Sequence, residues 1–541
     1  MSENAKLTGR QGRNVCGGWR IKRRQRRKPG KKRVWRPRFA GRIGIYRLPY
    51  GSMRKRFECQ LQMGQTAIEK IEIPLKSRDE LPPILAGLQW MFLTPEVNEE
   101  IFEILEEKVQ GDKKQTGRPG MELWHILVLG VVRLGLDCDY DRLEHHANYD
   151  VLLRQLLGVA PILEEGRGFH QKTLSQNVCH VDEELLAKIN AVVARHGRKE
   201  FKKKEDEKIA AKTDSYVLET NVHFPTDLNL LWDGARKCIE LLKDLSQEAG
   251  VGSWRKDKHW KRIIKGQMRT VGRISQGGGK DKAARLEQAV KAYLNKAREL
   301  ERKVSANIEE LSALLTSPLH ILKLDEARYF HEMLVKHIDL VERRLIQKET
   351  IPHEEKVFSL FEPHTEWIVK GKSRPPVELG HKILITTDQH QLVIDYKVME
   401  KSQDDQETLP LARRLFENYG EDCFESMSFD KGFSRVRDRQ ELEEQVPLVI
   451  MPKKGKLSGE DQERESARKF VRFKNRHSAI ESNINSLEHH GLNRCPDKGL
   501  NGYKRYAGFG ILAYNLHRIG AQLLKKKRER LEGRRRPKKA A

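Results

Sequence analysis

A single predicted strand stands apart from all the others in this chain. Residues 208–224 favour a strand, whereas residues 228–350 carry apolar side chains at helical spacing, broken only at 250–253 and 277–279. From residue 351 the apolar period changes to two. The first strand must therefore pair with later strands across a long insertion, which predicts a mixed α/β core interrupted by a helical block.

The later strands alternate with helices. Strands are expected at 365–369, 382–387, 392–399, 426–430 and 446–452, and helices at 408–419, 434–445, 468–488 and 503–524. Upstream of the first strand, helices are expected at 95–109, from 119 onward, and at 141–146, 151–157 and 174–196. The last of these segments suits either a helix-turn-helix or a plain helical bundle. Asp227 is expected to cap the helix that starts at residue 228.

The positive charge of the chain is concentrated at its ends. Residues 1–56 carry a net charge of +19, and residues 525–541 carry +8. Since the whole chain carries +26, the remaining residues, 57–524, contribute −1. Basic tails bind phosphate backbones without sequence preference. Residues 1–52 lack apolar periodicity, and their basic side chains repel one another, so we expect this segment to be disordered. Met53 is an alternative start of translation.

Several classes of protein are disfavoured by the composition. The seven cysteines are scattered without a CxxC pair, which argues against a zinc ribbon and against a disulfide framework. The longest apolar run, 126–136, is too short to span a bilayer, and no signal peptide is visible. We therefore expect a protein of a reducing cytosol with no membrane partner.

The first strand carries an aspartate near its middle. Asp214 lies in TDSYVLET, where a half-buried carboxylate is costly unless it is paired or binds a metal. Asp430 ends a later strand and is followed by Gly432, which permits a sharp exit. Glu481 borders the apolar stripe of the helix expected at 468–488. These three carboxylates are candidate partners at one edge of the sheet.

Two interpretations of the three carboxylates remain open on spacing alone. Hard oxygen donors suit Mg²⁺ or Mn²⁺, and two such ions roughly 4 Å apart can activate an attacking oxygen and stabilise a leaving one in phosphoryl transfer. Alternatively, the carboxylates are structural and form salt bridges. Other acidic residues, Asp388, Asp395 and Asp404, also lie near strand ends.

Two further groups of basic residues are candidates for DNA contact. The first lies on one face of a predicted helix within the insertion, opposite an apolar face, and comprises Lys258, Lys261, Arg262, Lys265, Arg269 and Arg273. A solvated charged face is the alternative. The second is a smaller patch around a predicted hairpin and comprises Lys370, Lys372, Arg374 and Lys382.

The blocks that contain the three carboxylates resemble those of a known family. TDSYVLETNVHFPTDLNLLWDG (213–234), SFDKGF (428–433) and HSAIESNINSLEHHGLNR (477–494) are similar to the catalytic blocks of DDE transposases of bacterial insertion sequences, in the broad group of families four and five and closest to the ISNCY type. Residues 116–158 and 363–383 resemble further blocks in the same order. The chain departs from related families at Glu488, where a lysine is common, and in the spacing of Arg476 from Glu481.

The resemblance implies a fold, a reaction and partners. It implies an RNase H-like core with Asp214, Asp430 and Glu481 as ligands of two Mg²⁺ or Mn²⁺ ions. Beside this, helical spacing places His477 and Lys474 four and seven residues before Glu481, and with Arg476 these residues are candidates for DNA contact. The resemblance also implies binding of terminal inverted repeats, strand cleavage and transfer to target DNA by a homodimer or higher assembly in the bacterial cytosol, at the nucleoid. The alternatives are an RNase H-like nuclease without strand transfer and an inactive, transposase-derived DNA-binding protein.

The predicted domain boundaries follow from these assignments. They are a basic tail at 1–57, a helical DNA-binding domain at 58–200, the first part of the core at 201–226, the helical insertion at 227–355, the second part of the core at 356–524 and a basic tail at 525–541.

Overall fold

The computed structural model describes residues 54–57, 65–110, 120–162, 166, 168–369 and 376–535. The contacts divide the chain into Met1–Tyr50 and Gly51–Ala541, and the first unit lies entirely outside the described residues. Most of the predicted N-terminal tail is therefore not described, and neither are Lys370, Lys372 and Arg374.

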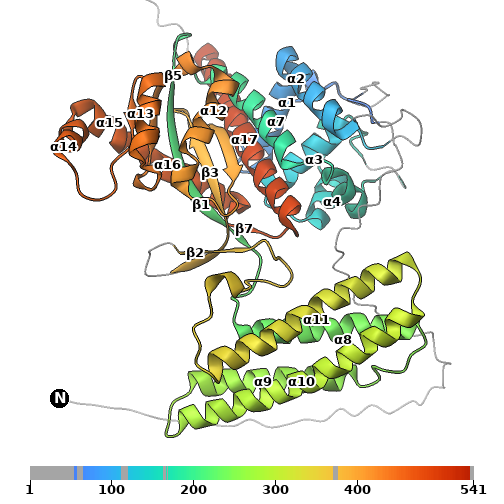
Figure 1. The fold of residues 1–541 in the computed structure, drawn as a ribbon. Coiled ribbons are helices and arrows are strands. Elements are labelled where there is room, and N and C mark those ends of the chain that lie inside the picture. The colour runs from blue at the N-terminus through green and yellow to red at the C-terminus, as the bar shows by residue number, and fades with distance from the viewer. Residues whose placement is uncertain are drawn as a thin grey trace, which may run out of the picture. The chain divides into compact units, whose positions relative to one another are not determined.

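A mixed sheet forms the centre of the second unit (Figure 1). Its central strand, β1 (Ile209–Thr220), pairs antiparallel with β3 (Val377–Thr387) on one side and parallel with β5 (Phe424–Phe429) on the other. The remaining strands are β2 (Glu366–Val369) and β4 (Val393–Val398), both antiparallel to β3, β6 (Val449–Ile450), parallel to β5, and β7 (Arg494–Cys495), parallel to β1. The predicted mixed α/β core is thus confirmed, although no period of two in the sequence indicates β7.

Both faces of β1 are covered, so the polar side chains in the middle of this strand lie in partly or fully buried positions. On one face, Tyr216 and Leu218 join a large hydrophobic cluster with the N-terminal helices. On the other, Ile209 and Ala211 join a smaller cluster with helix α12 (Thr408–Tyr419). Because side chains alternate between the faces of a strand, Asp214 lies on the same face as Tyr216.

The helices upstream of β1 share their core with the sheet. They are α1 (Leu81–Leu93), α2 (Pro95–Leu105), α3 (Leu123–Gly135), α4 (Tyr140–Tyr149), α5 (Val151–Leu156), α6 (Gln171–Val178) and α7 (Glu183–Gly197). They form one cluster with Tyr216, Ile383 and the last helix, α17 (Leu500–Arg535). The core therefore continues across the boundary predicted at residue 200.

The segment predicted as one helix at 174–196 consists of α6 and α7, separated where Asp182 caps α7. Ile189 and Val193 of α7 are completely buried, and α7 packs against α17, α2 and β4. Most of α7 is therefore covered by its neighbours, and its exposed side chains include Glu184 and Lys188.

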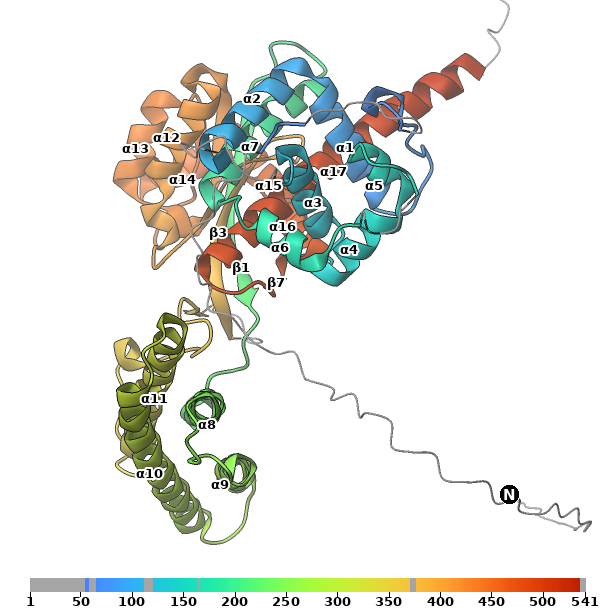
Figure 2. The ribbon, with the colours of Figure 1, turned by 90° about the vertical axis from the view of Figure 1, so that its right-hand side faces the viewer.

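The helical insertion is built from four long helices that lie side by side in Figures 1 and 2. They are α8 (Asp227–Glu248), α9 (Asp257–Gln276), α10 (Lys282–Leu314) and α11 (Pro318–Leu345), and they have a hydrophobic cluster of their own. The expected breaks at 250–253 and 277–279 are confirmed; a third break precedes Pro318, which starts α11. The expected cap is wrong by one residue: Thr226 accepts the hydrogen bond of Asn229 N, and Asp227 is the first helical residue.

The sequence after β5 forms short helices. They are α13 (Val436–Gln445), α14 (Gly459–Ser466), α15 (Arg468–His477) and α16 (Ala479–Leu487). The single helix expected at 468–488 is wrong, because it is interrupted at Ser478, whose hydroxyl donates back to Asn475 O. Downstream, a short π-helix (Glu488–Leu492) loses helical geometry at His490 and Gly491, so the His489–His490 pair lies at a helix end.

The last helix is longer than its apolar periodicity predicts. The pattern predicts a helix over 503–524, but α17 continues to Arg535, so residues 525–535 of the predicted C-terminal tail are helical. Among the described helices, none has the length and apolarity to cross a membrane.

Candidate functional site

Strand pairing brings two of the three predicted carboxylates together. The parallel register of β1 and β5 pairs Lys212 with Ser428 and Thr213 with Phe429. The next position along both strands places Asp214 beside Asp430, which directly follows β5. Neighbouring strands lie about 4.8 Å apart, and side chains in register point to the same face of the sheet. Asp214 and Asp430 are therefore neighbours at the edge where β5 ends.

The third carboxylate comes from the helices that cover this face. Helix α16 packs against β1 and α15 packs against β5. Ile480 and Leu487 of α16 are completely buried, whereas Glu481, in its first turn, is exposed. The break at Ser478 starts a new helix three residues before Glu481, so this carboxylate belongs to a helix N-terminus rather than to the middle of a long helix.

The charges of these residues act on one another. Burial raises the pKa of Asp214 to about 6, and the negative charges of Asp430, Asp404 and Glu481 act in the same direction. A hydrogen bond from Ser215 N (2.7 Å) opposes them, because it favours the charged form. Three other carboxylates thus lie close enough to disfavour the ionisation of Asp214. A cation at this edge would relieve that repulsion.

The donor set suits a hard divalent cation. Asp214, Asp430 and Glu481 offer only carboxylate oxygens, the ligands that Mg²⁺ prefers. Among the described residues, however, no three acidic, histidine or cysteine side chains are close enough to hold a metal ion as they are arranged here. Asp430 and Glu481 are both exposed, so rotation of their side chains is the movement that would close such a group around an ion.

Of the three alternative aspartates, two are structural. Asp388 is completely buried, pairs with Arg198 at 2.9 Å and accepts hydrogen bonds from backbone amides. Asp395 is buried and pairs with Arg414 at 2.8 Å. For these two, the salt-bridge interpretation applies.

The third alternative, Asp404, acts on the charge of Asp214, but its partners lie on the opposite face of β1. It lies in a short 3-10 helix (Asp404–Gln406) after β4, where its carboxylate accepts from Ser215 Oγ (2.9 Å) and pairs with Lys382 Nζ (2.8 Å). The sequence could not single it out, because its partners come from β1 and β3. Lys382, predicted as part of a DNA-binding patch, is instead committed to this ion pair.

A histidine and a lysine flank the same edge. His477 Nδ1 lies 3.0 Å from Ser428 Oγ, two residues before Asp430 on β5. Burial lowers the pKa of His477, and Asp430 and Lys212 both act on its charge. Burial also lowers the pKa of Lys212, whose ammonium donates to Asp388 O at 3.0 Å. His477 is therefore anchored to the sheet rather than free on the surface.

The predicted basic face of the insertion is only partly free. Lys261 pairs with Glu240 at 3.1 Å, and Lys265 lies 5.5 Å from the ring centre of Trp232, so both side chains face α8. The exposed cations of α9 are Lys258, Arg262, Arg269 and Arg273.

Helix α15 forms a second basic surface, most of which the sequence analysis does not predict. Helix α15 has no acidic residue and carries five exposed cations, namely Arg468, Lys469, Arg472, Lys474 and Arg476. None of the five forms an ion pair among the described residues, and Arg476 lies over the ring of Phe473. The sequence analysis names only Lys474 and Arg476 among these five; the run RKFVRFKNRH, without one acidic residue, is the signal that would have revealed the whole surface.

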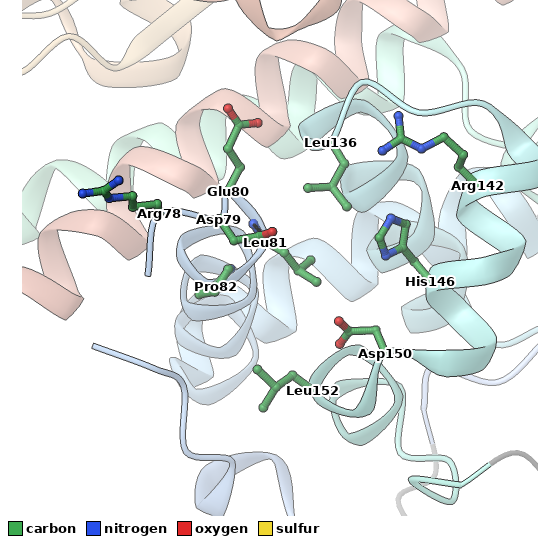
Figure 3. Close-up of a pocket in the computed structure, with 10 residues that line it drawn as sticks. All are labelled: Arg78, Asp79, Glu80, Leu81, Pro82, Leu136, Arg142, His146, Asp150 and Leu152. Atoms are coloured by element: carbon green, nitrogen blue, oxygen red, sulfur yellow. Dashed lines mark hydrogen bonds between the residues drawn. The ribbon is translucent and has the colours of Figure 1, made fainter. Parts of the chain in front are cut away.

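A hollow elsewhere in the second unit carries no comparable signal. It measures about 430 Å³ and lies between the start of α1 and helices α4 and α5, with Arg142, His146 and Asp150 on one side (Figure 3). Asp150 caps α5 through Leu153 N, and Asp79 accepts from Leu81 N. Two acidic groups of this hollow, Asp79 and Asp150, are thus engaged in helix starts.

Comparison of the chain with protein-family models, with curated proteins and with solved structures gave no match.

Proposed function

We propose that the chain is a DDE transposase that cleaves and transfers the strands of an insertion sequence. The observation that carries the proposal is the placement of Asp214 beside Asp430 on neighbouring parallel strands, with Glu481 on a helix packed against the first of them. The raised pKa of Asp214 supports it, because perturbed carboxylates gather at functional sites.

The strand order supports an RNase H-like core. The path from β3 through β1 and β5 to β6 has an antiparallel neighbour on one side of the central strand and two parallel strands on the other. In this proposal, the helical block α8–α11 is an insertion after the first core strand.

The residues at this edge divide the work of phosphoryl transfer. Asp214, Asp430 and Glu481 would hold two Mg²⁺ or Mn²⁺ ions, which supply the activation of the attacking oxygen and the stabilisation of the leaving one. The five cations of α15 bind the phosphates of the strand to be cut, and the ion pair of Asp404 with Lys382 keeps Asp404 beside β1. His477, tied to Ser428, keeps the end of α15 against β5.

The partner is DNA, both as terminal inverted repeats and as target, and the acting form is a homodimer or higher assembly. The exposed cations of α9 and α15 are the support for DNA binding. Transposition takes place in the bacterial cytosol, at the nucleoid.

The test uses the full chain and a plasmid that carries the gene with its flanking genomic sequence. With Mg²⁺, the wild-type protein should nick at the element ends and join them to a second plasmid. Asp430→Asn should abolish both steps and keep DNA binding, because it removes a metal ligand without changing the size of the side chain. Asp405→Asn is the matched control, since Asp405 pairs with Arg435 on the surface, and it should cleave normally.

The outcomes separate the alternatives. Normal cleavage by Asp430→Asn would refute the assignment of the site. Metal-dependent cutting without joining would identify a nuclease. DNA binding without any cutting would identify an inactive, transposase-derived binding protein.

A further inference from the structure

The short 3-10 helix that begins at Asp404 touches both β1 and the turn that follows β5. Asp404 Oδ1 accepts a hydrogen bond from Ser215 Oγ at 2.9 Å. Its other oxygen, Oδ2, lies against Gly432, because a Cβ atom on that glycine would be 3.4 Å away from it. Ser215 follows Asp214 in the chain, and Gly432 lies in the turn after Asp430. One carboxylate therefore contacts the neighbours of two candidate metal ligands.

Strand β1 is paired on only one side where Ser215 lies. On that side, Ser215 is opposite Leu384 of β3. On the other side, β5 ends opposite Thr213 and β7 begins opposite Glu219. Between these two positions, none of the described strands pairs with this side of β1. The hydrogen bond to Asp404 thus adds a restraint where strand pairing is incomplete.

The backbone of Ser215 in turn orients Asp214. Ser215 N donates to Asp214 Oδ1 at 2.7 Å. Because successive side chains point to opposite faces of a strand, the Ser215 hydroxyl meets Asp404 on one face while the Asp214 carboxylate lies on the other. A Ser215 side chain without its partner would let this amide turn, and Asp214 would lose the bond that orients it.

A lysine of β3 fixes Asp404 itself. Lys382 Nζ lies 2.8 Å from Asp404 Oδ2, and the two side chains are only 28% and 19% exposed. With Ser215 Oγ on one oxygen and Lys382 on the other, both oxygens of Asp404 are engaged. The carboxylate is therefore held in one orientation behind β1.

The turn after Asp430 is tied to the same segment by two further contacts. Thr408 Oγ1 donates to Phe433 O at 3.4 Å, and Asp405 pairs with Arg435 at 2.8 Å. The segment 404–408 therefore supports this turn as well as β1.

We propose that Asp404 is a positioning residue that sets the separation of Asp214 and Asp430. It fixes the first carboxylate through Ser215 and the turn after the second through Gly432. Because it lies behind β1, it orients the ligands and is not one of them. Removing a partner that orients metal ligands weakens metal binding by about 10- to 100-fold. This consequence for metal binding rests on the proposed function, whereas the orientation of Asp214 does not.

The first test measures Mn²⁺ binding to the full chain by electron paramagnetic resonance. The ions that are lost in Asp430→Asn define the site. Asp404→Ala and Ser215→Ala should each weaken binding of these ions by about tenfold or more. Ser215→Thr keeps the hydroxyl and should bind as the wild type does. Glu407→Gln is the matched control, because Glu407 pairs instead with Lys397 of β4 at 2.8 Å, and it should leave the affinity unchanged.

The double variant separates a shared route from two independent effects. Asp404→Ala combined with Ser215→Ala should bind Mn²⁺ no more weakly than Asp404→Ala alone, because both substitutions break the same hydrogen bond. Losses that add, or an affinity in either single variant equal to that of the wild type, would overturn the proposal.

Crystals grown without metal test the orientation of Asp214 directly. In Asp404→Ala and in Ser215→Ala, the Asp214 carboxylate should leave Ser215 N, whereas in Ser215→Thr it should stay. A carboxylate that keeps its wild-type position in both alanine variants would contradict the proposal. If the wild type and Asp430→Asn bind Mn²⁺ equally, the proposed metal site fails, and these crystals still decide whether Asp404 orients Asp214.

Discussion

At the scale of single residues, the carboxyl group of Asp214 has a strongly raised pKa at the candidate site. Its pKa of about 6 lies above the value of about 3.9 for an unfolded chain. The folded protein therefore binds the proton more tightly than the unfolded chain, and its stability falls as pH rises from about 4 to about 6. At neutral pH the ionised carboxylate lowers the free energy of unfolding, and a functional role would account for its presence.

Asp214→Asn should therefore stabilise the metal-free protein. At pH 7.5 we expect the free energy of unfolding to rise by about 1–3 kcal/mol, because the substitution removes a buried carboxylate that three others also repel. The advantage should vanish near pH 4, where Asp214 is protonated in the folded state. Denaturant titrations at the two pH values measure it. A variant that is no more stable than wild type at pH 7.5 would show that the repulsion is already offset within the protein.

Asp214 can be predicted from its local sequence, whereas residues whose partners come from other elements cannot. A carboxylate within a strand is visible in the sequence, as is the strand that ends at Asp430. The role of Asp404 depends on Ser215 and Lys382, which come from different strands, so no local pattern reveals it.

At the scale of elements, helices α1 and α17 cross almost backbone to backbone. A Cβ atom on Gly87 would lie 2.2 Å from Leu516 O, and one on Gly520 would lie 1.9 Å from Pro83 O. Only glycine fits at these two positions of the crossing, because the opposing atoms belong to the backbone and cannot rotate away.

Gly520→Ala should destabilise the protein by about 2–4 kcal/mol, since the two helices must separate to admit the methyl group. Gly533→Ala in the same helix is the control, because nothing lies within 4 Å of its Cβ, and it should be neutral or gain up to about 1 kcal/mol from helix propensity. Thermal unfolding of both variants decides the matter. Equal melting temperatures would mean that the helices do not cross this closely.

Periodicity predicts most elements but not all of their ends or their partners. Helix α12 has the two ends that the sequence predicts, because its apolar stripe is regular. The break at Ser478 escapes prediction, since the apolar stripe runs on while a serine hydroxyl bonds back to the chain. Strand β7 has two residues and exists only through its pairing with β1, so the sequence offers no period to detect.

At the scale of the whole molecule, two helices present exposed basic faces, in addition to the basic end of α17. One is formed by Lys258, Arg262, Arg269 and Arg273 of α9, and the other by the five cations of α15. The resemblance and the basic helix face both indicate DNA, but only the structure separates cations that are exposed from those, such as Lys261, that are paired.

Each face should contribute to the salt dependence of DNA binding. Changing Arg468, Lys469 and Arg472 to glutamine should weaken binding and reduce the slope of log K against log salt by about 0.9 for each phosphate that the variant no longer neutralises. The same change at Lys258, Arg262 and Arg269 tests α9. Lys291 and Lys296, which pair within α10, are the matched control positions. If the slope of log K against log salt is unchanged in a triple variant, that face does not contact DNA and is only solvated.

The central claim is that Asp214, Asp430 and Glu481 close around a pair of divalent ions. The most direct measurement is the anomalous diffraction of crystals grown with Mn²⁺. The account predicts two peaks roughly 4 Å apart, both within coordination distance of the three carboxylates, and their loss in Asp430→Asn. Crystals that contain Mn²⁺ elsewhere but none at this sheet edge, or that keep both peaks in Asp430→Asn, would contradict it.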